Sequence, residues 1–173
     1  AGWHERTGMG LPLSPHNCIN KLLWLQQQHP FLWQQVASVC TISDYVTLAL
    51  TGEKAADGST ASLLGLLDAQ ACAWWDEALR VAQLPRELLP AVFYMGMPVG
   101  KLSRQGAERL GLSEETHYSL GGLDHHMAAL GAGLYGTNNM SESTGTVLAA
   151  VQSTEQYHTQ EQVWVAPGMH AGH

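Results

Sequence analysis

Short apolar runs alternate with turn-forming residues along the chain, and the apolar spacing predicts helices for most of its first hundred residues. Ser14-Pro15, ahead of Leu22, Leu23 and Leu25, has the residue types that start a helix. That helix is expected to end near His29-Pro30, because proline disfavours a helical residue before it.

The next elements follow from the same signals. Val39-Cys40-Thr41-Ile42 is a short β-prone run, and residues 55–62 form a loop of small residues. Gly52 and Gly111 each follow an apolar periodic segment and are expected to end a helix. Further helices are predicted over residues 31–37, 44–50, 74–82 and 103–110.

The pattern changes after Gly111. A strand is predicted over residues 117–120, followed by a Gly121-Gly122 turn. A helix rich in Ala and Gly then begins at Asp124 and runs towards Gly136. Two strands are expected to pair at the end, over residues 147–151 and 162–166. A domain boundary is therefore expected between Gly121 and Ser143.

Composition narrows the classes of function. Of the 173 residues, 45% are hydrophobic and 13% are charged, which is typical of a globular protein. The net charge of −7, with only 8 Lys and Arg, argues against nucleic acid or an anionic membrane as partner. No segment reaches the ~18 apolar residues that cross a bilayer. Cys18, Cys40 and Cys72 are widely spaced, which favours buried thiols in a reducing cytoplasm. The missing initial Met suggests a fragment or a processed chain.

Asp124 is the leading candidate for chemistry. It follows a glycine turn at a predicted helix start, where the helix dipole favours the charged carboxylate. Such a carboxylate can accept a proton from a substrate hydroxyl, as phosphoryl transfer to an alcohol requires. A plain helix cap is the alternative interpretation.

Two further segments carry polar groups in glycine-containing loops. Residues 142–146 could bring backbone N–H groups close to phosphate oxygens, or could form a simple turn between strands. Asp57, Ser59 and Ser62 could hydrogen-bond a sugar, or could bond their own backbone as turn residues.

Eight short segments follow one another in a recognisable order. They are Leu50-Thr51-Gly52, Asp57-Gly58-Ser59-Thr60-Ala61-Ser62, Trp74-Trp75, Leu89-Pro90, Val99-Gly100-Lys101-Leu102, Gly111-Leu112, Gly121-Gly122-Leu123-Asp124 and Gly145-Thr146. In this order they resemble the FGGY family of carbohydrate kinases over nearly the whole chain.

The resemblance implies an α/β fold of the ribonuclease H-like, actin-like ATPase type, with two domains and a cleft between them. Residues 1–136 would form the mostly helical second half of the first, sugar-binding domain. Residues 137–173 would begin the second, ATP-binding domain. A small sugar or polyol would bind in the cleft, and ATP with Mg²⁺ would enter from the other side.

The resemblance also implies residue roles. Asp124 would be the catalytic base and would touch the sugar, as would His125. Gly145 and Thr146 would contact the ATP phosphates. Two departures bear on these roles: xylulose-type kinases carry Asn and glycerol-type kinases carry Gln where His125 stands, and many relatives carry Ser where Val147 stands. The Asp-x-Gly-Thr hairpin that opens the family and its adenosine-binding glycine motif are absent, so the isolated chain is expected to be inactive or nearly so.

Two alternatives compete with the kinase. Asp124-His125-His126 spells the triplet of a metal-dependent phosphoesterase family, although successive helical residues point about 100° apart and cannot all face one ion. The second alternative is a non-catalytic helical module. In it, His170 and His173 could bind a metal ion at helical spacing, or could belong to a solvated tail. The oligomeric state stays open, with Trp33, Trp74 and Trp75 suited either to a homodimer interface or to the core.

Overall fold

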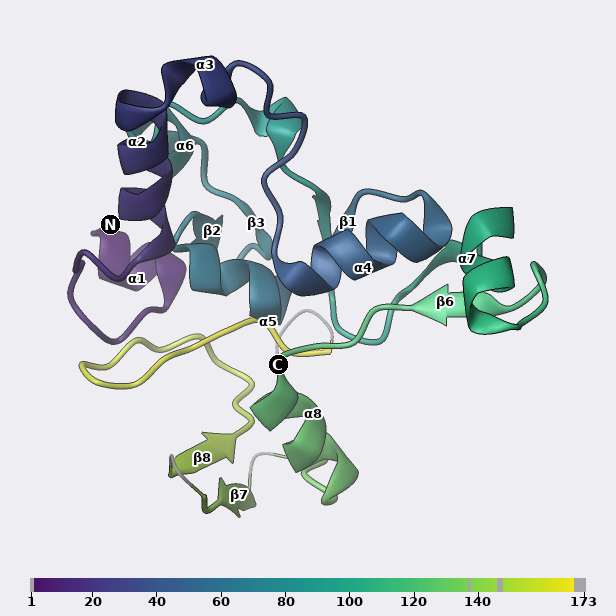
Figure 1. Cartoon of the computed structure of the whole chain (residues 1–173). Helices are drawn as coiled ribbons and strands as arrows, with labels where there is room; N and C mark the ends of the chain where they lie inside the picture. The colour runs from purple at the N-terminus through teal and green to yellow at the C-terminus, as the bar shows by residue number, and fades with distance from the viewer. Residues whose placement is uncertain (1, 137, 146–147, 170–173) are drawn as a thin grey trace.

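The computed structural model describes residues 2–136, 138–145 and 148–169 (Figure 1). The helices are α1 (Trp3–Thr7), α2 (Cys18–Gln28), α3 (Pro30–Trp33), α4 (Ile42–Thr51), α5 (Gly58–Ala61), α6 (Asp76–Val81), α7 (Arg104–Leu110) and α8 (Asp124–Gly131), with 3-10 turns η1 (Ser62–Leu64) and η2 (Arg86–Leu88). The strands are β1 (Ala55–Asp57), β2 (Leu67–Asp68), β3 (Ala73–Trp74), β4 (Ala91–Phe93), β5 (Pro98–Lys101), β6 (His117–Ser119), β7 (Met140–Ser143) and β8 (Ala149–Gln152).

Capping residues set the ends of α4 and α7. Thr41 and Asp44 form a capping box, in which each side chain accepts a hydrogen bond from the other residue's backbone N–H. Ser103 accepts from the Gly106 N–H at 3.0 Å and so caps α7. Left-handed glycines end both helices, Gly52 after α4 and Gly111 after α7. The structure thus confirms that these two glycines end helices, as the sequence predicts.

Several predicted elements differ from the structure. Residues 39–42 are not a strand: Thr41 caps α4, and the Val39 N–H donates to the Leu88 carbonyl oxygen at 2.7 Å. The helix expected from Ser14 begins at Cys18, because the Ser14 N–H donates to the Asn17 side chain in a preceding turn. Residues 55–61 form β1 and α5 and Ser62 begins η1, so this segment is not the predicted loop.

The described strands pair two by two. β1 and β4 run parallel, whereas β2–β3, β5–β6 and β7–β8 are antiparallel pairs. The predicted partner of the last strand is therefore wrong, because β8 pairs with β7 and not with residues 162–166.

The core lies where α2, η1 and α6 meet the β2–β3 pair. Its buried residues are Ile19, Ala56, Ala61, Leu64, Leu66, Leu67, Trp74, Ala78, Leu79, Ala82, Leu84 and Leu89. Trp33 and Trp75 pack against this cluster, and the Trp74 indole N–H donates to the Pro90 carbonyl oxygen at 2.7 Å. The three tryptophans considered for an interface thus belong to the core and its margin. Within the described residues, the helices are too short or too polar to cross a membrane.

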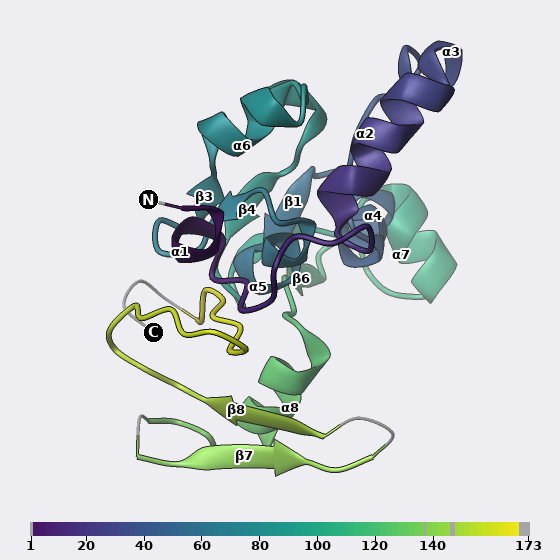
Figure 2. The ribbon, with the colours of Figure 1, turned by 90° about the vertical axis from the view of Figure 1, so that its left-hand side faces the viewer.

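Helix α8 and the β7–β8 hairpin extend away from this core, and the chain after β8 returns to its start (Figures 1 and 2). The returning segment pairs with the residues just after α1 through two backbone hydrogen bonds of 2.8 Å, from Gln162 N–H to the Gly10 carbonyl and from Val165 N–H to the Gly8 carbonyl. A Cβ on Gly8 or Gly10 would overlap the backbone of this segment, so only glycine permits the approach.

Candidate functional site

Asp124 is the first residue of α8, as the sequence predicts, and its side chain is exposed. One carboxylate oxygen accepts a hydrogen bond of 2.8 Å from the backbone N–H of His125. The four N–H groups that open a helix carry partial positive charge, which stabilises a carboxylate there. The structure therefore has an exposed carboxyl group at the start of a helix.

Two backbone hydrogen bonds fix Leu120, the residue before the Gly121-Gly122 turn. The Leu120 N–H donates to the Met97 carbonyl oxygen at 2.9 Å, and the Gly96 N–H donates back to the Leu120 carbonyl oxygen at 3.0 Å. A Cβ on Gly122 would overlap the Met95 side chain, which is itself buried. Glycine at 122 therefore lets the chain pass close to Met95 before α8 begins.

Asp57, Ser59 and Ser62 do not face an open sugar site. Their side chains are buried, with exposed fractions of 3%, 0% and 0%. Asp57 accepts from the Thr60 N–H at 2.9 Å, and the Ser62 hydroxyl donates to the Ser59 carbonyl at 2.7 Å. The side chains of Asp57 and Ser62 thus bond nearby backbone groups, as the second interpretation predicts, but in a strand end and short helices rather than in a turn. The Ser59 hydroxyl also accepts from the Leu123 N–H at 2.9 Å, a contact that the sequence did not indicate.

His126 and Trp164 form an aromatic pair beside the start of α8. Their rings stack with centroids 5.9 Å apart and planes at 27°. The buried His126 Nδ1 and Trp164 Nε1 atoms have no hydrogen-bond partner within the described part of the chain. Burial lowers the pKa of His126, an effect opposed by the nearby charges of Asp57 and Asp124 and reinforced by that of His125.

His125, Gly145 and Thr146 complete the predicted set. His125 is half-buried, one position after Asp124 in α8. Gly145 lies exposed in the connection from β7 to β8, where a Cβ would meet no neighbour. Thr146 lies outside the described residues. Asp124 and His125 are adjacent, whereas no hydrogen bond joins Asp124 to Gly145 among the described interactions.

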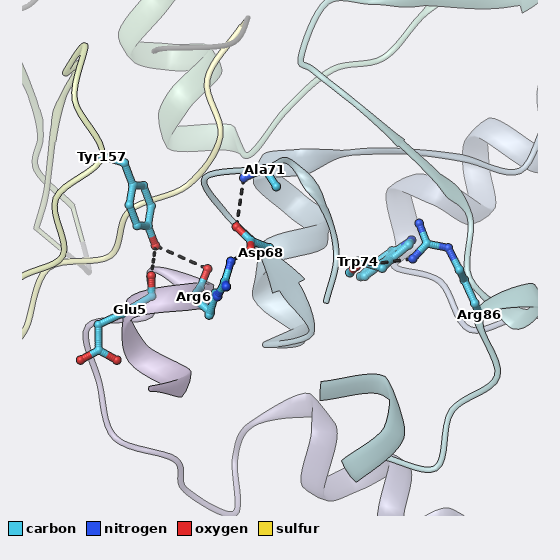
Figure 3. A network of polar contacts seen from close by, with 7 residues as sticks. All are labelled: Glu5, Arg6, Asp68, Ala71, Trp74, Arg86 and Tyr157. Atoms are coloured by element: carbon cyan, nitrogen blue, oxygen red, sulfur yellow. Dashed lines mark hydrogen bonds and ion pairs between the residues drawn. The ribbon is translucent and has the colours of Figure 1, made fainter. Parts of the chain in front are cut away.

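A polar cleft that the sequence did not reveal lies between α1, the β2–β3 turn and the returning segment (Figure 3). Arg6 and Asp68 form an ion pair across it at 2.5 Å. Burial, together with Asp68 and Glu5, raises the pKa of Tyr157 to about 12. The cleft is lined by Glu5, Arg6, Asp68, Gln70, Tyr157, His158 and Thr159. No motif marks it, because its residues come from three distant parts of the chain.

The alternative metal site finds no ligand set in the described residues. No group of three or more His, Cys, Asp or Glu side chains gathers there at distances suited to one ion. His170 and His173 lie outside the described residues.

Comparison with known proteins identifies the family of this chain. The model of the N-terminal domain of the FGGY family of carbohydrate kinases matches residues 4–131. Autoinducer-2 kinase of Escherichia coli K12 is 32% identical over 172 residues, which cover 96% of this chain and 32% of that protein. The Klebsiella pneumoniae autoinducer-2 kinase is 30% identical with the same coverage.

Solved structures show the same fold. Xylulose kinase from Rhodospirillum rubrum superposes with a TM-score of 0.86 at 22% identity, covering 96% of this chain and 34% of that one. Gluconate kinase from Lactobacillus acidophilus gives a TM-score of 0.79 at 25% identity, covering 89% and 31%. The chain spans about a third of the length of the curated relatives it matches. It belongs to the FGGY family of carbohydrate kinases.

Proposed function

We propose that this chain is part of an ATP-dependent sugar kinase that transfers the γ-phosphate of ATP to a hydroxyl of a ketose, polyol or sugar acid. The observation that carries the proposal is the position of Asp124: an exposed carboxylate at the first residue of α8, in a chain of the carbohydrate kinase family. In this proposal, Asp124 accepts the proton of the attacking hydroxyl as it bonds to the γ-phosphorus. The leaving group is ADP.

The remaining assignments follow the family. Residues 1–136 would belong to the sugar-binding domain and residues 137–173 to the start of the ATP-binding domain, which fits the match of the N-terminal domain model to residues 4–131. The complete architecture would be ribonuclease H-like. His125 would contact the sugar, and Gly145 and Thr146 the ATP phosphates. Mg²⁺ would enter bound to ATP.

The names of the relatives define the substrates to try. Relatives of this chain are named autoinducer-2, xylulose, gluconate and glycerol kinases. The proposed substrate of the full-length protein is therefore a small polyhydroxylated molecule. We propose that the protein works in the cytoplasm, with neither nucleic acid nor a membrane as a partner. A homodimer is compatible with this function but not required by it.

The test is a coupled assay of ADP release with ATP and a panel of ketoses, polyols, sugar acids and autoinducer-2. The full-length protein implied by the proposal should release ADP in response to at least one of these. The isolated chain of 173 residues should not. Failure of the full-length protein with the whole panel would count against the kinase function, and robust turnover by the isolated chain would refute its expected inactivity.

A further inference from the structure

A chain of hydrogen bonds connects the end of β1 and the start of α5 to the start of α8. The Leu123 N–H donates to the Ser59 hydroxyl oxygen at 2.9 Å, across 64 positions of sequence. The Ser59 hydroxyl in turn donates to a carboxylate oxygen of Asp57. This relay of hydrogen bonds thus ends at the residue immediately before Asp124.

The direction of each hydrogen bond in the relay is fixed by its chemistry. A backbone N–H can only donate, and a serine hydroxyl has one proton to donate. The single hydroxyl proton of Ser59 is therefore committed to Asp57, and its oxygen is left to accept from Leu123. Ser59 is fully buried, so water cannot replace either partner without opening the structure.

Asp57 is held in place by its own local structure. It is the last residue of β1, which pairs with β4, and it caps α5 by accepting from the Thr60 N–H at 2.9 Å. Only 3% of Asp57 is exposed, which fits a carboxylate whose role lies within the fold. The relay therefore starts from a paired strand rather than from a mobile loop.

Leu123 occupies the capping position of α8, and its side chain cannot cap a helix. Its carbonyl oxygen accepts the first helical hydrogen bond, from the Met127 N–H at 2.9 Å, while its N–H binds Ser59. Both polar groups of the Leu123 backbone are thus fixed, one by the helix and one by the relay. Because the Cα of Asp124 is bonded to that peptide group, its position is fixed as well.

We infer that Ser59, oriented by Asp57, is a positioning residue that sets where the Asp124 carboxylate stands relative to the substrate hydroxyl. The inference rests on the proposed kinase function. Proton acceptance requires the base within hydrogen-bond reach of the reacting hydroxyl, and an error of about 1 Å can cost roughly 100-fold in rate. Ser59 does not touch substrate in this proposal, and it acts through Leu123.

Ser59→Ala in the full-length protein removes the relay while keeping α5. The expected result is a fall in kcat of roughly 10- to 100-fold with the KM for ATP little changed, because the residues proposed to contact the ATP phosphates, Gly145 and Thr146, are not part of the relay. Ser62→Ala is the matched control. Ser62 is equally buried, three residues further on at the start of η1, but its hydroxyl donates to the Ser59 carbonyl oxygen and has no hydrogen bond to α8. Its kcat should stay within about twofold of the wild-type value.

A double-mutant cycle separates positioning from general damage. In an Asp124→Asn background, Ser59→Ala should cause no further loss of residual turnover, because the group that it positions is already gone. An equal loss in both backgrounds would overturn the inference, as would a Ser59→Ala kcat within about twofold of the Ser62→Ala value. If Ser59→Ala does not fold, Ser59→Cys replaces it, since a thiol is of similar size and a weaker hydrogen-bonding group.

Amide hydrogen exchange tests the relay without any activity. The Leu123 N–H should exchange faster in Ser59→Ala than in Ser62→Ala, because its buried acceptor is lost. Equal exchange in the two variants would overturn the inference. An inactive wild-type protein with faster exchange in Ser59→Ala would instead refute the proposed kinase function and leave the relay standing as a positioning device for α8.

Discussion

The Tyr157 hydroxyl donates a hydrogen bond of 2.8 Å to the carbonyl oxygen of Glu5, a residue 152 positions earlier in the chain. This bond ties the segment after β8 to α1, beside the ion pair of Arg6 and Asp68 (Figure 3). Tyr157 and Glu5 both line the polar cleft, so the bond links two of its walls.

Tyr157→Phe should loosen this attachment. We expect the free energy of unfolding to fall by about 1 kcal/mol, the usual net contribution of one hydrogen bond. Urea denaturation followed by circular dichroism measures the change. Tyr135→Phe is the control, because Tyr135 is 81% exposed. Equal stability of the two variants would show that the Tyr157 hydroxyl contributes nothing to the fold.

Asp124→Asn in the full-length protein tests the proposed base. The amide keeps the shape of the carboxylate and cannot take up the proton, so turnover should fall by roughly 100-fold or more while sugar binding persists. Steady-state kinetics and calorimetric titration with the preferred sugar measure the two effects. Asp76→Asn, in an exposed ion pair with Arg86, should leave turnover unchanged. Full turnover by Asp124→Asn would remove Asp124 from the mechanism.

Gly106→Ala tests the contact between α4 and α7. A Cβ at this position would overlap the Leu50 carbonyl oxygen, which also accepts from the Ser103 N–H at 2.8 Å. The two helices must separate to admit it, and we expect a loss of roughly 1–3 kcal/mol of stability. Gly131→Ala is the control: a Cβ there meets nothing, and alanine should stabilise α8 by up to about 1 kcal/mol. The midpoint of thermal unfolding, measured for both variants, tests this prediction. An unchanged midpoint for Gly106→Ala would contradict the close contact between α4 and α7.

His126 should make stability depend on pH. Burial lowers its pKa in the folded state, so below the ordinary value of 6.5 the unfolded chain binds the proton more readily. The stability that neutral, buried His126 allows is fully present above pH 6.5. It is lost as the pH falls from 6.5 towards the lowered pKa of the folded state. His126→Phe keeps a ring against Trp164 and removes the titration.

Unfolding free energies measured from about pH 7.5 to about pH 5 should therefore fall less for His126→Phe than for the wild type. His117→Gln, on the exposed side of β6, serves as the control and should follow the wild-type curve. The wild-type slope persisting in His126→Phe would assign the pH dependence to another group.

Local signals made some elements predictable. The end of α4 at Gly52 and the whole of α7, from its Ser103 cap to Gly111, depend on residues within one or two helical turns. The start of α8 at Asp124 follows for the same reason, since a glycine turn and a short apolar helix are adjacent in sequence. These elements need no distant partner to take their form.

Other elements depended on distant partners. Val39-Cys40-Thr41-Ile42 has strand-forming residues, yet Thr41 caps a helix and Val39 bonds to Leu88. Residues 162–166 look like a strand, but their backbone partners are Gly8 and Gly10 at the other end of the chain. No local pattern encodes such a pairing.

The candidate site divides in the same way. The motif around Gly121-Gly122 predicted that a helix begins at Asp124, and the structure confirms this start, whereas the roles of Asp124 and His125 stay predictions. The segment of Asp57 and Ser59 was also identified, but not its bond to Leu123, because the two segments are separated by a whole series of helices and strands. The aromatic pair of His126 and Trp164 escaped detection because its rings come from separate segments.

The long sequence separation of the Ser59–Leu123 bond has a consequence for the order of folding. Contacts between distant residues form only after a large loop closes, and their entropic cost delays them relative to local helices. The first turn of α8 can therefore exist before Asp57 and Ser59 reach it. The proposed base would acquire its final place late, when β1 and α5 pack beside α8, so a folding intermediate with most of its helices formed would still lack an aligned catalytic carboxylate.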